Sequence, residues 1–248
     1  MITLRSLLKV VYSIDRAVSV LIVIMFVIVL FVGAYFTADA AYVFSHASGN
    51  KIAAYRPVVT GDGQEVQSEE VTMPFTKDYV GWITVNGTTL DYPVMQGETN
   101  STYLNTDPYG EYSLAGSIFL DCRNASDFSD DYSILYGHHM AGGYMFGCLD
   151  DYFSEEFFEG HRDGTLIVDG VAYPVKAFAV LATDAVVSTV FNPKPTDDVV
   201  AYAKQTAVFY RDDTEGRVLA LSTCSNPSNT ERTVVLFRIS EVVMDACE

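Results

Sequence analysis

The 248-residue sequence predicts a mainly β fold, a barrel or sandwich of short strands with a few helices, preceded by one transmembrane helix. Three observations lead to this prediction. An uncharged apolar run lies near the N-terminus, over residues 17–36. From residue 79 onward, short β-type runs follow one another with turn signals between them. Only two segments of this later part, 145–158 and 195–210, have the apolar spacing or the capping signals of a helix.

The run over 17–36 reads AVSVLIVIMFVIVLFVGAYF and carries no charge over 20 residues, the length that a helix needs to cross a bilayer core. It is apolar on every side, which argues against a helix of a soluble domain. Arg5, Lys9 and Arg16 precede the run, and Asp39 is the first charge after it. The positive-inside rule therefore predicts a cytoplasmic N-terminus and an extracellular remainder.

A cleaved signal peptide is the alternative, because Ala38-Asp39-Ala40 resembles a cleavage site. The apolar run is longer than the roughly 7–15 apolar residues of a usual signal peptide, so we expect an uncleaved anchor. The predicted parts of the chain are a cytoplasmic N-terminus (1–16), a transmembrane anchor (17–36), a juxtamembrane linker with some helix (37–77) and an extracellular domain (78–248).

Two pairs of runs predict β-hairpins. GWITVNGTTLDYPV joins two β-type runs through Asn86-Gly87, the strongest short hairpin signal, and TLIVDGVAYPVKAFAVLAT repeats the pattern around Asp169-Gly170. The last two apolar runs should be antiparallel neighbours if a turn joins them. In the second helical segment, Thr196 or Asp197 is the expected N-cap. The remaining runs predict short strands at 116–122, 132–137, 217–223 and 233–240.

The formal net charge of −17 argues against nucleic-acid binding, which requires a basic surface. The aspartates of 121–131 lack the spacing of a calcium-binding EF-hand, so we interpret this segment as a solvated loop and expect no metal.

The cysteines are widely spaced with no C-x-x-C, which indicates neither a zinc ribbon nor a thioredoxin-like site. Cys122 and Cys148 lie inside predicted elements and are expected to be structural thiols, whereas Cys247 should have no fixed role. The fourth cysteine, Cys224, has a different position, because it ends the apolar run VLALST just before a turn.

A thiol at the end of a strand can meet a substrate, and a nearby base or cation favours its reactive thiolate. His138 also ends an apolar run, YSILYGH, so the two residues can converge on one rim of a barrel. Arg232 opens the last strand, where antiparallel pairing would set it beside Cys224 as a donor to an oxyanion. The alternative is a set of unrelated core and surface residues. His46 and His161 are expected at the surface.

These residues resemble those of the sortases, specifically class B. The resemblance rests on LSTC with an arginine and a strand soon after it, and on LYGHHM upstream. It extends through DYVGWITVNGTTLDYPVMQG, YLNTDPYGEYSLAGSIFLDCRN and YGHHMAGGYMFGCL, and so covers roughly residues 75–240. Each piece alone is weak, but the combination is specific.

The resemblance implies an eight-stranded β-barrel with added helices and a catalytic set of Cys224, His138 and Arg232. His138 is preferred to His139 because the family histidine directly follows the glycine of YGH. No metal or organic cofactor is implied. The chain departs from some relatives after the cysteine, where it lacks an acidic residue, and its segment 181–194 matches no family pattern. The implied substrate-binding residues are Asn100, Leu104 and Ser222.

The expected function is that of a membrane-anchored cysteine transpeptidase of a Gram-positive bacterium. Its partners would be surface proteins with an NPxT-type sorting signal and an amine of a peptidoglycan peptide or its lipid-linked precursor, without nucleic acid. Two alternatives stay open from the sequence. One is a secreted cysteine protease that uses water as acceptor, and the other is a non-catalytic, surface-binding β-barrel in which Cys224 is a structural thiol.

Overall fold

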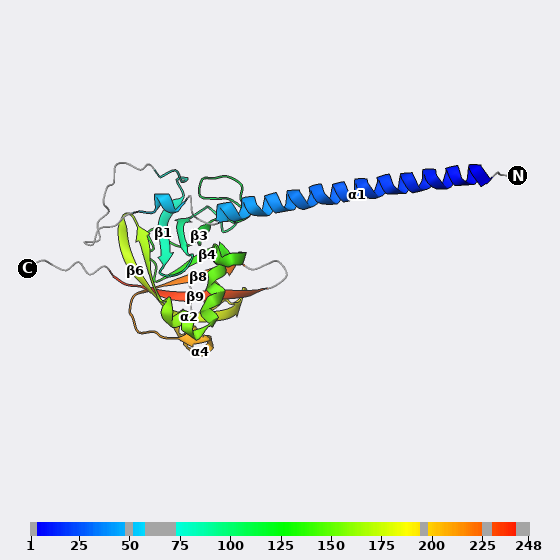
Figure 1. Cartoon of the computed structure of the whole chain (residues 1–248). Helices are drawn as coiled ribbons and strands as arrows, with labels where there is room; N and C mark the ends of the chain where they lie inside the picture. Colours follow the sequence, from blue (N-terminus) through cyan, green and yellow to red (C-terminus); the bar gives the residue numbers. More distant parts are fainter. Residues whose placement is uncertain (1–3, 48–51, 58–72, 194–197, 225–229, 242–248) are drawn as a thin grey trace, which may run out of the picture. The chain divides into compact units, whose positions relative to one another are not determined.

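The computed structural model describes residues 4–47, 52–57, 73–193, 198–224 and 230–241. These residues belong to two units, Met1–Phe44 and Ser45–Glu248. Figure 1 shows the long N-terminal helix of the first and the barrel of the second.

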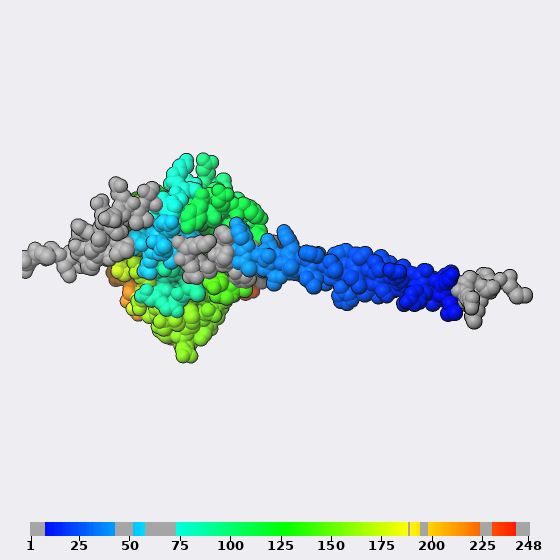
Figure 2. Space-filling model, turned by 45° about the horizontal axis from the view of Figure 1, so that its top comes forward, coloured from blue at the N-terminus to red at the C-terminus, as the bar shows by residue number. Residues whose placement is uncertain are grey.

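The N-terminal helix, α1, runs over Leu4–Ala47 and contains the predicted anchor at 17–36. Within its stretch Leu8–Tyr42, an 18-residue window has a mean hydropathy of 3.1 and no residue buried in the protein, so the helix is long and apolar enough to cross a membrane. Figure 2 shows these side chains at the surface of the helix. Helix therefore continues into the segment predicted as a linker, which also contains the 3₁₀-helix η1 (Ala53–Tyr55).

Eight strands of the second unit form a closed barrel, in the order β5-β1-β2-β3-β4-β8-β9-β6 with β6 paired back to β5. This confirms the predicted eight-stranded barrel. A ninth short strand, β7, pairs with β6 at Ala179 and Val180, beyond the part of β6 that pairs with β5. The strands are β1 (Tyr79–Val85), β2 (Asp91–Met95), β3 (Ile118–Leu120), β4 (Tyr132–His138), β5 (Asp163–Val168), β6 (Val171–Asp184), β7 (Phe209–Tyr210), β8 (Arg217–Cys224) and β9 (Glu231–Ile239).

Both predicted hairpins are present, as β1–β2 and β5–β6. In the second, Asp169 and Gly170 both have positive φ, at 49° and 76°. A two-residue turn of this kind matches the right-handed twist of the strands that it joins. The predicted antiparallel pairing of β8 with β9 is also confirmed.

The pairing of β4 with β8 is parallel, although the two strands are far apart in the sequence. A parallel pair needs a long crossover, and residues 139–216 supply it. This crossover contains β5, β6 and β7 together with the helical elements η2 (Ala141–Gly143), η3 (Gly147–Phe153), α2 (Glu155–Gly160), α3 (Ser188–Phe191) and α4 (Val199–Thr206).

The helices differ from the prediction in their extent. The single helix expected over 145–158 is wrong, because Ser154 has an extended backbone between η3 and α2 and caps α2 by accepting a hydrogen bond from Phe157 N. Helix α4 ends at Thr206, since Phe209 and Tyr210 pair with β6 as β7. Its N-cap is Asp198, while the two residues expected to cap it, Thr196 and Asp197, lie outside the described residues.

The core has two main layers, one inside the barrel and one on its outer face. Leu135 and Leu221 belong to the inner cluster, to which η3 and α2 add Leu149 and Phe158. Ile134 and Ala220, the sequence neighbours of those two leucines, belong instead to an outer cluster covered by α3 and α4. The alternation follows from the pleat of the strands, whose successive residues face opposite sides. Both faces of β4 and β8 are therefore buried over most of their length.

A chain that starts at Ser45 should fold and remain soluble without detergent. Among the described residues, every buried side chain of the hydrophobic core comes from Ile52 or later, so the barrel needs no contact from α1. Circular dichroism and size-exclusion chromatography of the truncated and the full chain test this. Aggregation of the truncated chain, with a full chain that stays soluble without detergent, would contradict it.

Cys148 should be an unreactive thiol in the folded protein. Its side chain lies in the inner cluster at 3% exposure, and burial raises its pKa to about 11. Near neutral pH only on the order of one molecule in ten thousand then carries the thiolate, the reactive form.

Alkylation followed by peptide mapping should label the half-exposed Cys122 much faster than Cys148 in the native protein, and both equally after unfolding in guanidinium chloride. Native labelling of Cys148 at the rate of Cys122 would show that the inner cluster is open at this point.

Candidate active site

Three sequence-predicted residues lie in one row at the end of strands β4, β8 and β9. The parallel register of β4 and β8 pairs His138 with Cys224. The antiparallel register of β8 and β9 ends with Ser222 opposite Val234, and the same register carried two residues further would set Arg232 opposite Cys224. Positions that lie opposite one another on neighbouring strands share a face of the sheet. His138, Cys224 and Arg232 therefore occupy the same edge and the same outer face.

The imidazole of His138 is oriented by a backbone carbonyl. Its Nε2 lies 2.7 Å from Leu104 O. A carbonyl oxygen only accepts hydrogen bonds, so Nε2 carries a proton in this arrangement. The other ring nitrogen, Nδ1, is then the one available to exchange a proton with a reacting group.

The Leu104 carbonyl reaches His138 because the segment 99–105 is fastened to the end of β3. Asn100 Nδ2 donates to Asp121 Oδ2 over 2.9 Å, and Asn100 Oδ1 accepts from Cys122 N over 2.8 Å. Asn100 was predicted to bind substrate, and here each polar group of its amide already has one protein partner. An amide still has one further donor hydrogen and one further lone pair.

Asp121 is a fully buried carboxylate that the sequence did not distinguish from its neighbours. It accepts hydrogen bonds from Arg123 Nε and Nη2 over 2.8 and 2.7 Å, and from the Tyr136 hydroxyl over 3.0 Å. Burial alone would raise the pKa of Asp121, but the bonds from Arg123 and Asn100 outweigh it and hold the pKa below its usual value. The interpretation of this segment as a solvated loop is therefore wrong for Asp121.

One donor of Arg232 is buried and has no partner among the described residues. Its Nη1 makes no hydrogen bond with any group in the described part of the chain. A buried guanidinium N–H of this kind is costly unless something else accepts its hydrogen bond. Its place in the row suits it to an oxygen atom of a bound substrate.

Ser222, the third residue predicted to bind substrate, also lies on the outer face, opposite Tyr136 on β4 and Val234 on β9. Its side chain is buried, with 1% of the residue exposed. Leu104 is half-buried and, like Tyr136, packs against a small cluster of Met95, Tyr103 and Phe119. Leu104 and Ser222 thus flank the row, while Asn100 supports it through the segment that it holds.

The remaining histidines have other partners or lie outside the described side chains. His139 Nε2 is 2.8 Å from Asp150 Oδ2, and the other oxygen of Asp150 accepts from Thr233 Oγ1 over 2.6 Å. His161 was expected in solvent, but its ring stacks on Phe157 with centroids 3.9 Å apart and its Nδ1 lies 2.9 Å from Phe157 O. The residue is half-buried and forms the C-cap of helix α2.

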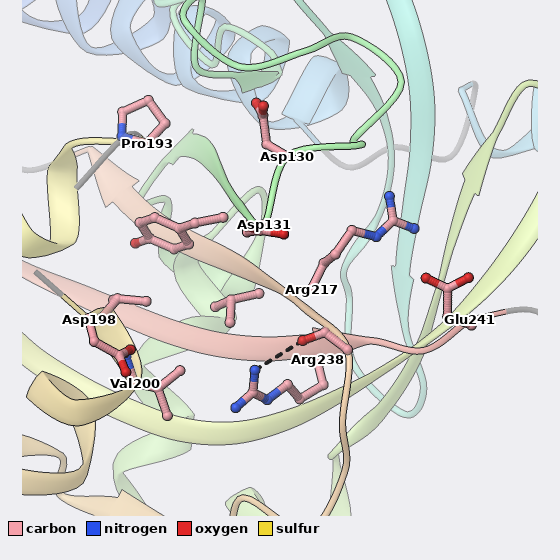
Figure 3. Close-up of a pocket in the computed structure, with 12 residues that line it drawn as sticks. Asp130, Asp131, Pro193, Asp198, Val200, Arg217, Arg238 and Glu241 are labelled. Atoms are coloured by element: carbon pink, nitrogen blue, oxygen red, sulfur yellow. Dashed lines mark hydrogen bonds between the residues drawn. The ribbon is translucent and has the colours of Figure 1, made fainter. Parts of the chain in front are cut away.

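A cavity of about 820 Å³ lies away from this row, at the opposite end of β8 (Figure 3). Its wall includes Arg217, Arg238 and Glu241. Arg217 and Cys224 are seven positions apart on the strand, a distance of roughly 23 Å. The cavity holds none of the predicted site residues and is separate from the row.

Comparison with known proteins supports one family throughout. The chain is 36% identical to sortase B of Staphylococcus aureus over 175 residues, which cover 67% of this chain and 72% of that relative. It is 35% identical to sortase B of Listeria monocytogenes over 164 residues, which cover 63% of this chain and 66% of that relative. No protein-family model matches the sequence.

Solved structures agree. Spy0129, a Streptococcus pyogenes class B sortase involved in pilus biogenesis, is 38% identical with a TM-score of 0.61 over 67% of this chain and 94% of that one. A Staphylococcus aureus sortase B–substrate complex is 34% identical with a TM-score of 0.63 over 68% of this chain and 82% of that one. The barrel, the motifs and these relatives together show that the chain belongs to the class B sortases, a family of cysteine transpeptidases.

Proposed function

We propose that the protein is a membrane-anchored transpeptidase that acts on an NPxT-type sorting signal through Cys224, His138 and Arg232. The observation that supports this proposal is the cross-strand row, in which β4 and β8 pair His138 with Cys224 and the β8–β9 register, carried two residues further, leads to Arg232. The family supplies the reaction class, and a relative in this family has been solved as a substrate complex.

In the first half-reaction the Cys224 thiolate attacks the carbonyl carbon of the Thr–X bond in the sorting signal. Negative charge develops on the carbonyl oxygen, and the unpartnered Nη1–H of Arg232 is suited to donate to it. The carbon–nitrogen bond then breaks, and His138 gives its proton to the departing amine. The product is a thioester between Cys224 and the threonine.

In the second half-reaction an amine of a peptidoglycan peptide, or of its lipid-linked precursor, attacks the thioester. His138 takes the proton from the amine, the carbon–sulfur bond breaks, and the thiolate returns. Leu104 and Ser222 flank the row and are proposed to contact the sorting signal, and Asn100 retains one donor and one acceptor for it.

Helix α1 would anchor the enzyme, with its basic N-terminal end in the cytoplasm and the barrel outside. This location suits the reaction, because the sorting signal and the cell-wall amine would both reach the enzyme on the extracellular side of the cell membrane. The chain's likeness to a class B sortase involved in pilus biogenesis makes a pilin amine a second candidate acceptor.

Cys224→Ala should abolish the covalent intermediate, because the thioester needs this sulfur. Intact-mass spectrometry after mixing with an NPxT peptide should detect the acyl-enzyme for the wild type and for Cys122→Ser and Cys148→Ser. With a peptide amine added, the wild type should form the amide product. Cleavage by Cys224→Ala would refute the mechanism, and hydrolysis alone despite abundant amine would favour a protease.

His138→Ala should lose nearly all turnover, whereas His139→Ala should keep most of it, because the His139 ring is held by Asp150 rather than by Leu104. Arg232→Lys keeps the charge but loses the planar donor, and a lost oxyanion donor costs roughly 10²–10³ in rate. Steady-state kinetics on a peptide substrate measure all three. An inactive His139→Ala enzyme, or an Arg232→Lys enzyme as fast as wild type, would overturn these roles.

A further inference from the structure

The buried carboxylate of Asp121 lies beside the row without being part of it. It sits just past the end of β3, is fully buried, and accepts hydrogen bonds from side chains of three different residues. A buried charge is costly unless it is fully paired, so the loss of any of these hydrogen bonds would destabilise the fold around Asp121. The three partners connect Asp121 to three segments that surround the row.

The first connection leads to His138 through the backbone. Asp121 holds Asn100 by its Nδ2, and Asn100 in turn accepts from Cys122 N, so this end of the segment 99–105 is fixed at two points. Four residues later, the Leu104 carbonyl accepts from the His138 ring. The position of that carbonyl therefore depends on where Asn100 is held.

The second connection leads to the opposite side of the row through Arg123. The guanidinium binds both oxygens of Asp121 and also donates from Nη2 to Phe191 O over 2.8 Å. Phe191 ends α3, in the segment 185–193 that follows β6. That segment begins beside the row, since Ala185 N donates to Thr230 O, two residues before Arg232.

The third connection is within β4 itself. The Tyr136 hydroxyl donates to Asp121 Oδ2, and Tyr136 precedes His138 by two residues on the same face of the strand. Asp121 thus joins the strand that carries the histidine to both flanking segments.

We propose that Asp121 is a positioning residue for transpeptidation, which holds the Leu104 carbonyl on His138 through Asn100 and the segment 185–193 through Arg123. This inference rests on the proposed function for its kinetic consequences. Asp121 touches no reacting atom, and its effect on turnover passes through the orientation of the His138 ring.

Kinetics of the full chain in detergent test the first connection. Asp121→Asn replaces an acceptor by an amide whose N–H₂ faces the donors of Asn100 and Arg123. We expect kcat to fall by about ten- to a hundredfold, the scale of a small misplacement of a catalytic group. Asp130→Asn is the matched control, because Asp130 is also hydrogen-bonded within the same loop, to Asn124 and Ala125, but among the described residues it makes no hydrogen bond to Asn100, Arg123 or Tyr136. It should change kcat by less than about twofold.

A double-mutant cycle separates positioning from direct substrate contact. If Asn100 acts through Asp121, the Asn100→Ala/Asp121→Asn enzyme should be no slower than the slower single variant. Losses in kcat/KM that multiply would show that the two residues act independently and would overturn the proposed connection. Arg123→Lys keeps a cation beside Asp121 but loses the planar donors that also reach Phe191 O, so it should raise KM severalfold with a smaller change in kcat. Equal losses of kcat in all three variants, with KM unchanged, would indicate general loosening instead.

The histidine ring can also be observed without turnover. In ¹⁵N-histidine-labelled full chain, the Nε2–H signal of His138, assigned with His138→Gln, should be protected from exchange in the wild type and in Asp130→Asn. It should be lost in Asp121→Asn and in Asn100→Ala. If Asp121→Asn does not fold, the Asn100→Ala protein provides the test. Persistence of the signal in a folded Asp121→Asn protein would overturn the positioning role. Absence of a Cys224 adduct in the wild type would overturn the proposed function instead, and leave this result intact.

Discussion

The parallel pairing of β4 with β8 is the constraint on which the site depends. It sets His138 opposite Cys224 although 85 residues separate them in the chain. Both faces of this pair are buried, with Leu135 and Leu221 inside the barrel and Ile134 and Ala220 under α3 and α4. A slip of one residue would exchange the two faces, so packing over the whole length of the strands fixes the register at their ends.

Closure of the barrel extends this constraint to the arginine. Strand β9 pairs with β8 on one side and with β6 on the other, and the β6 register places Arg232 opposite Thr183. Arg232 is therefore positioned from two neighbours at once. The proposed catalytic set of three residues from three strands would need this rigidity, because small displacements of reacting groups are costly in rate.

Two ion pairs, Arg162 with Asp213 and Arg238 with Asp212, stabilise the barrel away from the proposed active site. Arg162 is buried and bonds to Ala177 O, Arg211 O and both oxygens of Asp213. The hydrogen bond from Arg162 lowers the pKa of Asp213, and that from Arg238 lowers the pKa of Asp212. Carboxylates of lowered pKa stabilise the fold above the unfolded pKa and lose that contribution as the pH falls through the folded value. The folded domain should thus become less stable in acid, where the carboxylates of Asp212 and Asp213 become protonated.

The sequence was sufficient for features that local signals encode. The two residues Asp169 and Gly170 were enough to predict a hairpin turn, and the sequence around Cys224 was enough to predict a strand that ends there. Helix ends were less predictable, because Ser154 interrupts a run whose apolar spacing is continuous.

Asp121 was missed for a physical reason. An aspartate among four in a polar segment looks solvated, and its burial depends on Asn100 and Tyr136, from other parts of the chain, joining the nearby Arg123 around it. Only the FLDCRN portion of the family resemblance contained the residue, without indicating its role.

The most direct test of the central claim is a crystal structure of the protein with an NPxT peptide that carries a thiol-reactive group in place of the scissile carbonyl. The account predicts a covalent bond to Cys224, an oxygen of the adduct within hydrogen-bond distance of Arg232, and a His138 ring still held by Leu104 O. An adduct on another cysteine, or a peptide bound with Arg232 turned away from its oxygen, would contradict it.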